Sequence, residues 1–178
     1  MQLETWVLNL EDQPDRWDTM RRHLDGWGIT DPKRFNAIPP VEGEVPVWRG
    51  RDRKNVPKRV AIVRTYARLM QTLEGRDADR FLVVQDDIRF TADPHRKFTH
   101  PLHLYGGYTI RPRGWGIYKE IHVHPWAFTI QRDFVRSLWQ EWAEPVKPSC
   151  ELWTRIIRPD TTTYDDPATA TTGVTRGD

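Results

Sequence analysis

The sequence has very little cysteine and no long apolar run. Cys150 is the single cysteine among 178 residues, which excludes an internal disulfide framework and a cysteine-based zinc site. No stretch approaches the ~20 apolar residues that a membrane helix needs, and the first residues have neither the basic nor the apolar segment of a signal peptide. We therefore expect a soluble, cytoplasmic protein without a membrane span.

Several common catalytic motifs are also missing. The chain has no Gly-x-Gly-x-x-Gly after an apolar run, no Gly-Lys-Ser/Thr phosphate loop, no Gly-x-Ser-x-Gly and no His-Glu-x-x-His. The common dehydrogenase, P-loop, serine hydrolase and zincin classes therefore lose their main support.

Tryptophan, in contrast, is abundant. Nine tryptophans offset a mean hydropathy of −0.72, because each buried aromatic side chain removes roughly 150–250 Å² from water. Trp17 and Trp27 fall on a helical face and are expected to build the core. Trp48 lies in a stretch without helical periodicity and is a candidate for ligand contact.

Short apolar runs alternate with helical patterns along the chain. The runs at 5–9, 33–38, 80–85 and 126–131 predict strands, and helices are predicted from Pro14, from Pro57, around 134–142 and over 151–157. The helix from Pro57 should bury a stripe of apolar residues, namely Ile62, Tyr66, Leu69, Met70 and Leu73. We expect one α/β domain over 1–178, with an extended basic loop at 39–57, a turn-rich stretch at 94–116 and an irregular tail at 159–178.

Two carboxylates follow the most strand-like run. Asp86 and Asp87 come directly after residues 80–85, where an α/β sheet usually places its active site. At a strand end one carboxylate can meet a metal while the other reaches a ligand hydroxyl, and oxygen ligands suit Mg²⁺ or Mn²⁺. The alternative is a turn with two solvated acids.

Two other groups of polar residues are candidates for the same site. His122 and His124 share a face if their segment is extended, so either can join Asp87 as a metal ligand; ordinary loop histidines are the alternative. Glu151 is a candidate general base, or else an acid that stabilises the first turn of a helix.

The basic residues are concentrated in one stretch. Residues 49–68 carry a net charge of +7 in a chain whose total is +2, so the remainder is net negative; the cations are Arg49, Arg51, Arg53, Lys54, Lys58, Arg59, Arg64 and Arg68. Such a cluster attracts the phosphates of a nucleotide or a nucleic acid, and Trp48 beside it can stack on a base. A solvated helix face next to a loop is the alternative.

The order of five segments resembles a known family. The segments are residues 6–17, 34–38, 81–90, 125–138 and 164–167. Residues 81–90 are similar to "Leu-Glu-Asp-Asp-Val-x-Phe", the metal-binding signature of a GT-A fold, and residues 6–10 to a "hydrophobic-Asn-Leu" first strand. The chain therefore resembles glycosyltransferase family 25, which includes lipopolysaccharide glycosyltransferases, in its short phage-type form.

The chain departs from that family at two places. Gln85 stands where the signature has its first acid, and Arg64 lies in the segment that matches the family's "Gly-Cys-x-x-Ser-His", whose Ser-His pair is absent. The functions of those family residues are therefore not carried over.

The resemblance implies a GT-A-like, Rossmann-like domain with a mixed, mostly parallel sheet flanked by helices. It implies a nucleotide sugar donor, a UDP sugar, with Mn²⁺ or Mg²⁺ on its diphosphate. Asp87 would be a metal ligand, and His124 or His122 would complete the metal shell. Asp86 would hold ribose or sugar hydroxyls.

The resemblance also implies a nucleoside pocket and a reaction course. Asn9 and Leu10 would line the pocket and Arg16 would support it, while an inverting displacement would use Glu151 as its base. For the acceptor we expect a hydroxymethylated pyrimidine of DNA, flipped out of the duplex and held by Trp48, the basic loop and nearby cations. A saccharide or lipopolysaccharide acceptor is one alternative, and a non-catalytic DNA-binding protein with a degraded transferase fold is another.

Overall fold

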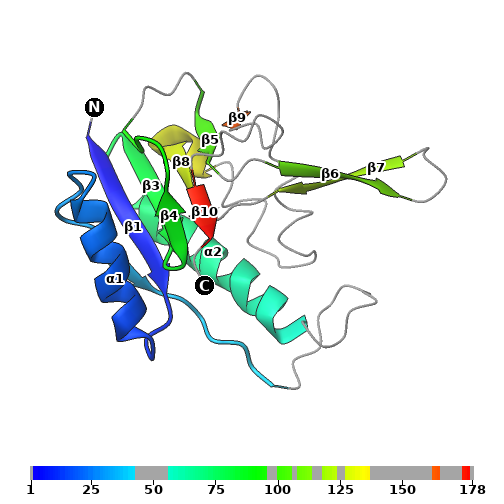
Figure 1. The fold of residues 1–178 in the computed structure, drawn as a ribbon, viewed down its shortest axis with the longest axis horizontal. Coiled ribbons are helices and arrows are strands. Elements are labelled where there is room, and N and C mark those ends of the chain that lie inside the picture. Colours follow the sequence, from blue (N-terminus) through cyan, green and yellow to red (C-terminus); the bar gives the residue numbers. More distant parts are fainter. Residues whose placement is uncertain are drawn as a thin grey trace.

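The computed structural model describes residues 2–42, 56–95, 100–105, 108–113, 118–123, 127–136, 162–164 and 174–176. Its helices are α1 (Pro14–Asp25) and α2 (Val56–Glu74), and residues 132–136 are also helical. Its strands are β1 (Leu3–Asn9), β2 (Lys33–Asn36), β3 (Arg80–Gln85), β4 (Ile88–Phe90), β5 (Leu102–Leu104), β6 (Tyr108–Arg113), β7 (Tyr118–Val123), β8 (Ala127–Gln131), β9 (Thr162–Tyr164) and β10 (Val174–Arg176) (Figure 1).

The central sheet is mixed and mostly parallel, as the family resemblance implies. Among the described residues its strand order is β2-β1-β3-β8-β5-β9, and only β8 runs against the others. Two further antiparallel pairs, β4–β10 and β6–β7, lie outside it. The α/β class, with helices flanking such a sheet, is therefore confirmed.

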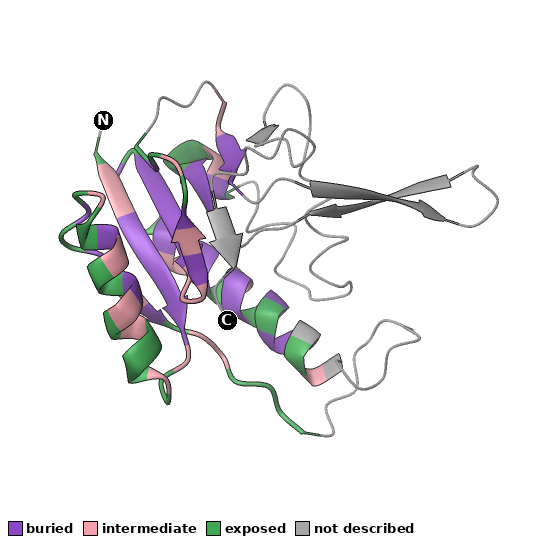
Figure 2. Ribbon diagram, in the orientation of Figure 1, coloured by how far each residue is buried: buried purple, intermediate pink, exposed green. Residues whose placement is uncertain are grey.

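Both faces of the sheet are covered, and β3 shows why its sequence is continuously apolar. Phe81 and Val83 enter the core that contains α2, whereas Leu82 and Val84 enter the core that contains α1. Because successive strand residues point to opposite faces, a strand covered on both sides needs apolar residues at every position. Figures 1 and 2 show the two helices on opposite faces, each with its buried residues toward the sheet.

The buried stripe of α2 matches the prediction except at its first member. Tyr66, Leu69, Met70 and Leu73 are each 1% exposed or less, whereas Ile62 is 39% exposed. The prediction for Ile62 was wrong because the first half of α2 borders a cavity, described below, instead of the packed sheet. Helical periodicity identifies one face of a helix, but it does not tell where the covering layer stops.

Several strands lie where the sequence predicts turns or an irregular tail. β5 and β6 fall within 94–116, and β9 and β10 fall within 159–178. β5 and β9 have three residues each, and β9 pairs with a partner about sixty residues earlier in the chain. Strands of this length have no hydrophobic period of their own, so they exist only through long-range pairing. In the part of the chain that the structure describes, no helix has the length and apolar character needed to cross a membrane.

Candidate functional site

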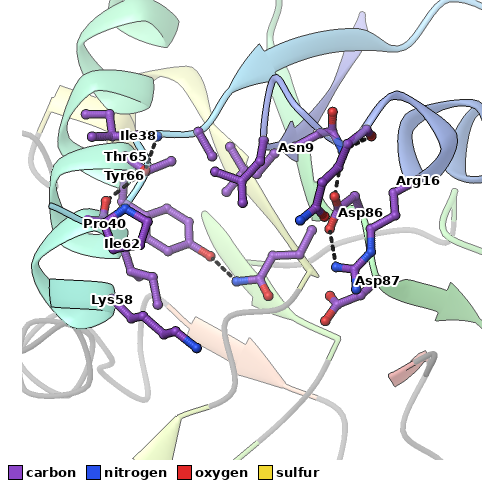
Figure 3. A pocket seen from close by; sticks show the side chains of 16 residues that line it. Asn9, Arg16, Ile38, Pro40, Lys58, Ile62, Thr65, Tyr66, Asp86 and Asp87 are labelled. Atoms are coloured by element: carbon purple, nitrogen blue, oxygen red, sulfur yellow. Dashed lines mark hydrogen bonds and ion pairs between the residues drawn. The ribbon is translucent and has the colours of Figure 1, made fainter. Parts of the chain in front are cut away.

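A cavity of about 290 Å³ lies where β1, β2 and β3 end, against the first half of α2. The three strands are parallel, so their carboxyl ends meet at one edge of the sheet. The turn from β1 to α1 forms one wall, the residues after β3 form its floor, and α2 with the residues after β2 forms the opposite wall (Figure 3). This is the edge at which open α/β sheets usually bind ligands.

A hydrogen-bonded network forms the polar wall. The Asn9 amide nitrogen donates to Asp86 Oδ2 at 2.6 Å and to the main-chain oxygen of Gln13 at 3.0 Å. The Asn9 oxygen accepts from Arg34 Nε at 2.9 Å, and the same guanidinium donates to the main-chain oxygens of Leu10 and Glu11 at 3.1 Å each. Arg34 of β2 thus holds the β1–α1 turn and the Asn9 side chain, and Asn9 in turn holds Asp86, which follows β3.

Asp86 is largely withdrawn from water. Its side chain is 12% exposed, and Arg16 Nη1 lies 3.9 Å from its Oδ1. Burial raises the pKa of Asp86; the hydrogen bond from Asn9 and the charge of Arg16 lower it, and the charge of Asp87 raises it. Burial is the largest of these effects, so ionising Asp86 in the folded protein costs stability.

The opposite wall is mostly apolar. Ile38, Pro40 and Ile62 line it, together with the ring of Tyr66. The hydroxyl group of Tyr66 accepts a hydrogen bond of 3.1 Å from the Gln85 amide, at the junction of the apolar and polar walls. Gln85 stands where the resembled family has an acid, and its amide has a hydrogen-bond partner in the Tyr66 hydroxyl of α2.

β4 continues the chain directly after the acid pair and is anchored to α1. The Phe90 main-chain nitrogen donates to His23 Nε2 at 2.8 Å, and the two rings stack with centroids 6.1 Å apart. Burial, followed by the charge of Arg89, lowers the pKa of His23. A neutral His23 can accept this hydrogen bond, so it fixes the far side of the Asp86–Asp87 turn.

The structure brings together residues that the sequence singled out in three separate segments. Asn9, Leu10, Arg16, Asp86 and Asp87 all line the same cavity, and so does Lys58. Arg64 is an exposed residue of α2 that does not line it. His122 belongs to β7, where its backbone pairs with Thr109, and Arg59 belongs to α2; the side chains of both are outside the description. The remaining predicted site residues are outside the described ranges, namely Trp48, Arg49, Arg51, Arg53, Lys54, His124 and Glu151.

Sequence reasoning missed three contributors to this site. Arg34 belongs to a segment that resembles the second strand of the family, but no function was assigned to it. Thr65 and Tyr66 read as members of a helix, and nothing in the local pattern indicates that they meet Ile38 and Gln85. These contacts join residues 19 or more positions apart, so the local sequence carries no signal for them.

The donor set at this edge fits a hard divalent cation that arrives with phosphates. Within the described residues, no group of three or more His, Cys, Asp or Glu side chains is placed to hold a metal ion. Mg²⁺, however, usually keeps several waters and uses only one or two carboxylates plus substrate phosphates. Asp86 and Asp87 at the cavity floor meet that smaller requirement.

Comparison with known proteins identifies the fold. No family model matches the sequence, and no curated protein matches it. Among solved structures, a glycosyltransferase involved in the glycosylation of the major capsid of PBCV-1 aligns with a TM-score of 0.57 and 11% identity over 94% of this chain and 83% of its own. A mutant of Drosophila β-1,4-galactosyltransferase 7, in complex with manganese, UDP-Gal and xylobiose, aligns with a TM-score of 0.51 and 9% identity over 92% of this chain and 65% of its own. At these identities the likeness concerns the fold, and this chain has the α/β fold of GT-A glycosyltransferases.

Proposed function

We propose that this chain is a glycosyltransferase, related to family 25, that moves a sugar from a UDP sugar to a hydroxyl group. The observation that carries the proposal is the single cavity that joins Asn9, Leu10 and Arg16 to Asp86 and Asp87. Its apolar wall suits a nucleoside, and its acid floor suits a diphosphate bound with a cation. The fold, shared with solved glycosyltransferases, supports the same activity.

Each residue of the cavity has a role in this proposal. Asn9 orients Asp86, which accepts hydrogen bonds from ribose or sugar hydroxyls, and Arg16 supports Asp86 at the mouth of the pocket. Asp87, with His124 or His122, would hold Mn²⁺ or Mg²⁺. That ion would offset the negative charge that develops on the leaving diphosphate.

The inverting course expected from the sequence is part of the proposal. It needs a base that removes the proton from the acceptor hydroxyl as the bond to the sugar forms. Glu151 is the residue that we propose for this role.

Release of UDP from a panel of UDP sugars in the presence of Mn²⁺ tests the activity. We expect Asp87→Ala to lose at least about 100-fold in rate, since removal of one stabilising group of this kind costs roughly 10²–10³. Asp77→Ala is the matched control, because the Asp77 side chain is 99% exposed and does not line the cavity. Equal rates for wild type and Asp87→Ala would contradict the proposed role.

For the acceptor, we propose a hydroxymethylated pyrimidine base in DNA. The support is the run of cations that leads from residue 49 into α2, with Trp48 beside it and Arg64 on the exposed face of the helix. Such a run favours a polyanion, and a base inside a duplex must be flipped to reach a cavity of this kind. A saccharide acceptor, with the cations facing lipid phosphates, would use the same donor site.

Incubation with Mn²⁺, UDP sugars and either hydroxymethylcytosine DNA or plain DNA separates these acceptors. Nucleoside mass spectrometry should detect an added hexose only on the hydroxymethylated DNA. Neutralising Arg51, Arg53 and Lys54 should weaken duplex binding and reduce its salt dependence. Sugar transfer to saccharides alone would replace the DNA proposal, and DNA binding without any UDP release would indicate a non-catalytic binding protein.

A further inference from the structure

We propose that Lys58, on the α2 wall of the cavity, binds the diphosphate of the nucleotide sugar above the acid pair on the floor. This inference rests on the proposed function and assigns a residue to it. The sequence groups Lys58 with the cations expected to contact DNA. The structure instead places Lys58 in the lining of the donor cavity, apart from Arg64 and Arg68 of the same helix.

The position of Lys58 on α2 aims it at the cavity. Lys58 and Ile62 are four residues apart and therefore share a helix face, and both line the cavity. In Figure 3 the Lys58 side chain extends from α2 below Ile62, toward the side of the pocket on which Asp87 lies. Lys58 belongs to the α2 wall of the cavity and Asp87 to its floor.

The ammonium group of Lys58 is available for a ligand. Lys58 is an exposed residue, and among the residues that the structure describes no carboxylate pairs with it. Arg16, the second cation among the described lining residues, lies 3.9 Å from Asp86. Lysine is a common point-charge ligand for phosphate, and its long stem can reach across an opening while the charge stays hydrated.

Among the described residues that line the cavity, Lys58 balances the charge of the acid pair. The lining residues of acidic or basic type in that part of the chain are Arg16, Lys58, Asp86 and Asp87, two of each sign. A divalent cation bound with a diphosphate that carries one negative charge per phosphate adds nothing to this balance. Without Lys58 the filled site would hold a net negative charge. This charge would grow as the bond between the sugar and the diphosphate breaks, because the diphosphate leaves with one more negative charge.

Binding of UDP and of uridine to Lys58→Met tests the proposal. In the presence of Mn²⁺ we expect the variant to bind UDP roughly tenfold more weakly than wild type and to bind uridine unchanged, because uridine has no phosphate. Arg68→Met is the matched control: it removes the same charge from an exposed position on the same helix, outside the lining. It should bind both ligands as wild type does, and Lys58→Arg should retain most of the UDP affinity.

The outcomes separate this inference from the proposed function. Unchanged UDP affinity in Lys58→Met would overturn the inference alone, and so would an equal loss for uridine, which would indicate a structural effect. If Lys58→Met bound duplex DNA more weakly and UDP as wild type does, Lys58 would contact the DNA acceptor instead of the donor diphosphate. If the wild-type protein bound no UDP in this titration, the proposed function and the inference would both fall.

Discussion

Asn9 illustrates how a single buried amide can organise a site. It is 1% exposed, and its partners leave only one orientation for the amide. The Arg34 guanidinium only donates and the Gln13 carbonyl only accepts, so the oxygen of Asn9 must face Arg34 and its nitrogen must face Gln13. Asp86 therefore always faces an N–H group, which favours its carboxylate form and fixes its direction.

Asn9→Leu should destabilise the fold and abolish UDP release. The substitution keeps a similar volume but leaves Arg34, Gln13 and the buried Asp86 without their partner, at a cost of about 2–4 kcal/mol. Urea unfolding measures this cost. Asn36→Leu is the control, since Asn36 is exposed at the end of β2, directly beside Asn9 in the sheet, and should change stability by less than about 0.5 kcal/mol. Equal effects of the two substitutions would contradict the network.

Asp86→Asn should make the protein more stable at neutral pH while it loses activity. Because burial raises the pKa of Asp86, ionisation costs stability, and this cost appears as the pH rises from the unfolded-state pKa to the folded-state pKa. An Asn at this position avoids the cost and can still accept the hydrogen bond from Asn9. We expect a gain of about 0.5–2 kcal/mol at pH 7.5, and none below the unfolded-state pKa, where Asp86 is protonated in both states.

Urea unfolding of wild type and Asp86→Asn at several pH values checks this expectation. Asp77→Asn, at a 99% exposed carboxylate, should leave the pH profile unchanged. A variant less stable than wild type at pH 7.5 would mean that Asn9 and Arg16 outweigh burial.

At the scale of elements, the two halves of α2 have different surroundings. Its later turns pack Leu69 and Leu73 against the sheet, while its first turns line the cavity. Thr65 lies between these parts: its hydroxyl donates to the Ala61 carbonyl at 2.8 Å and accepts from the Ile38 main-chain nitrogen at 3.0 Å. This one side chain joins the segment after β2 to the helix, and so holds the two sides of the apolar wall together.

Thr65→Val should cost about 1–3 kcal/mol in unfolding free energy, because the Ile38 N–H loses its acceptor. It should also weaken UDP binding, since Ile38 belongs to the cavity wall. The matched control is Thr72→Val in the same helix, where the hydroxyl donates to the Arg68 carbonyl one turn earlier, a bond within the helix itself. Chemical denaturation and UDP titration of the two variants measure the difference, and a loss in Thr72→Val as large as in Thr65→Val would contradict the tertiary role.

At the scale of the whole molecule, stability depends on two cores that share the central strands. β1 and β3 contribute to both, through Trp6 and Val83 on the α2 side and Val7 and Leu82 on the α1 side. A domain of this size has a net stability of only about 5–15 kcal/mol. A defect in either core should therefore affect the cavity, which lies at the ends of the same strands.

Leu82→Ala should lower the unfolding free energy by about 2–5 kcal/mol, because it removes a fully buried side chain and leaves a cavity in the α1-side core. Thermal and urea unfolding measure the loss. Val41→Ala, at a residue that is 54% exposed, should change stability by less than about 0.5 kcal/mol. A small loss at Leu82 would mean that this core can repack around the deleted side chain.

How far the sequence predicts the fold depends on how local each signal is. Each of β1, β2, β3 and β8 has its own apolar run, and α1 and α2 each have their own helical periodicity. These elements were predicted because each pattern lies within one segment of the sequence. The three-residue strands β5 and β9 form through partners far along the chain and were not. The position of the acid pair after β3 was also predicted, because the end of a strand is visible in the sequence.

The sequence by itself determined the apolar strands and helix faces that build most of the two cores, and that two carboxylates follow a buried strand, since burial and strand ends leave local patterns. Only the tertiary structure decided that Lys58 belongs to the donor cavity, that Arg34 holds Asn9, and that Ile62 borders an opening. The physical reason is the chain path. The helix α2 connects β2 to β3, and β1 lies between these two strands in the sheet. The first turns of α2 and the end of β1 therefore line one cavity, an arrangement that depends on the crossover and on no single segment.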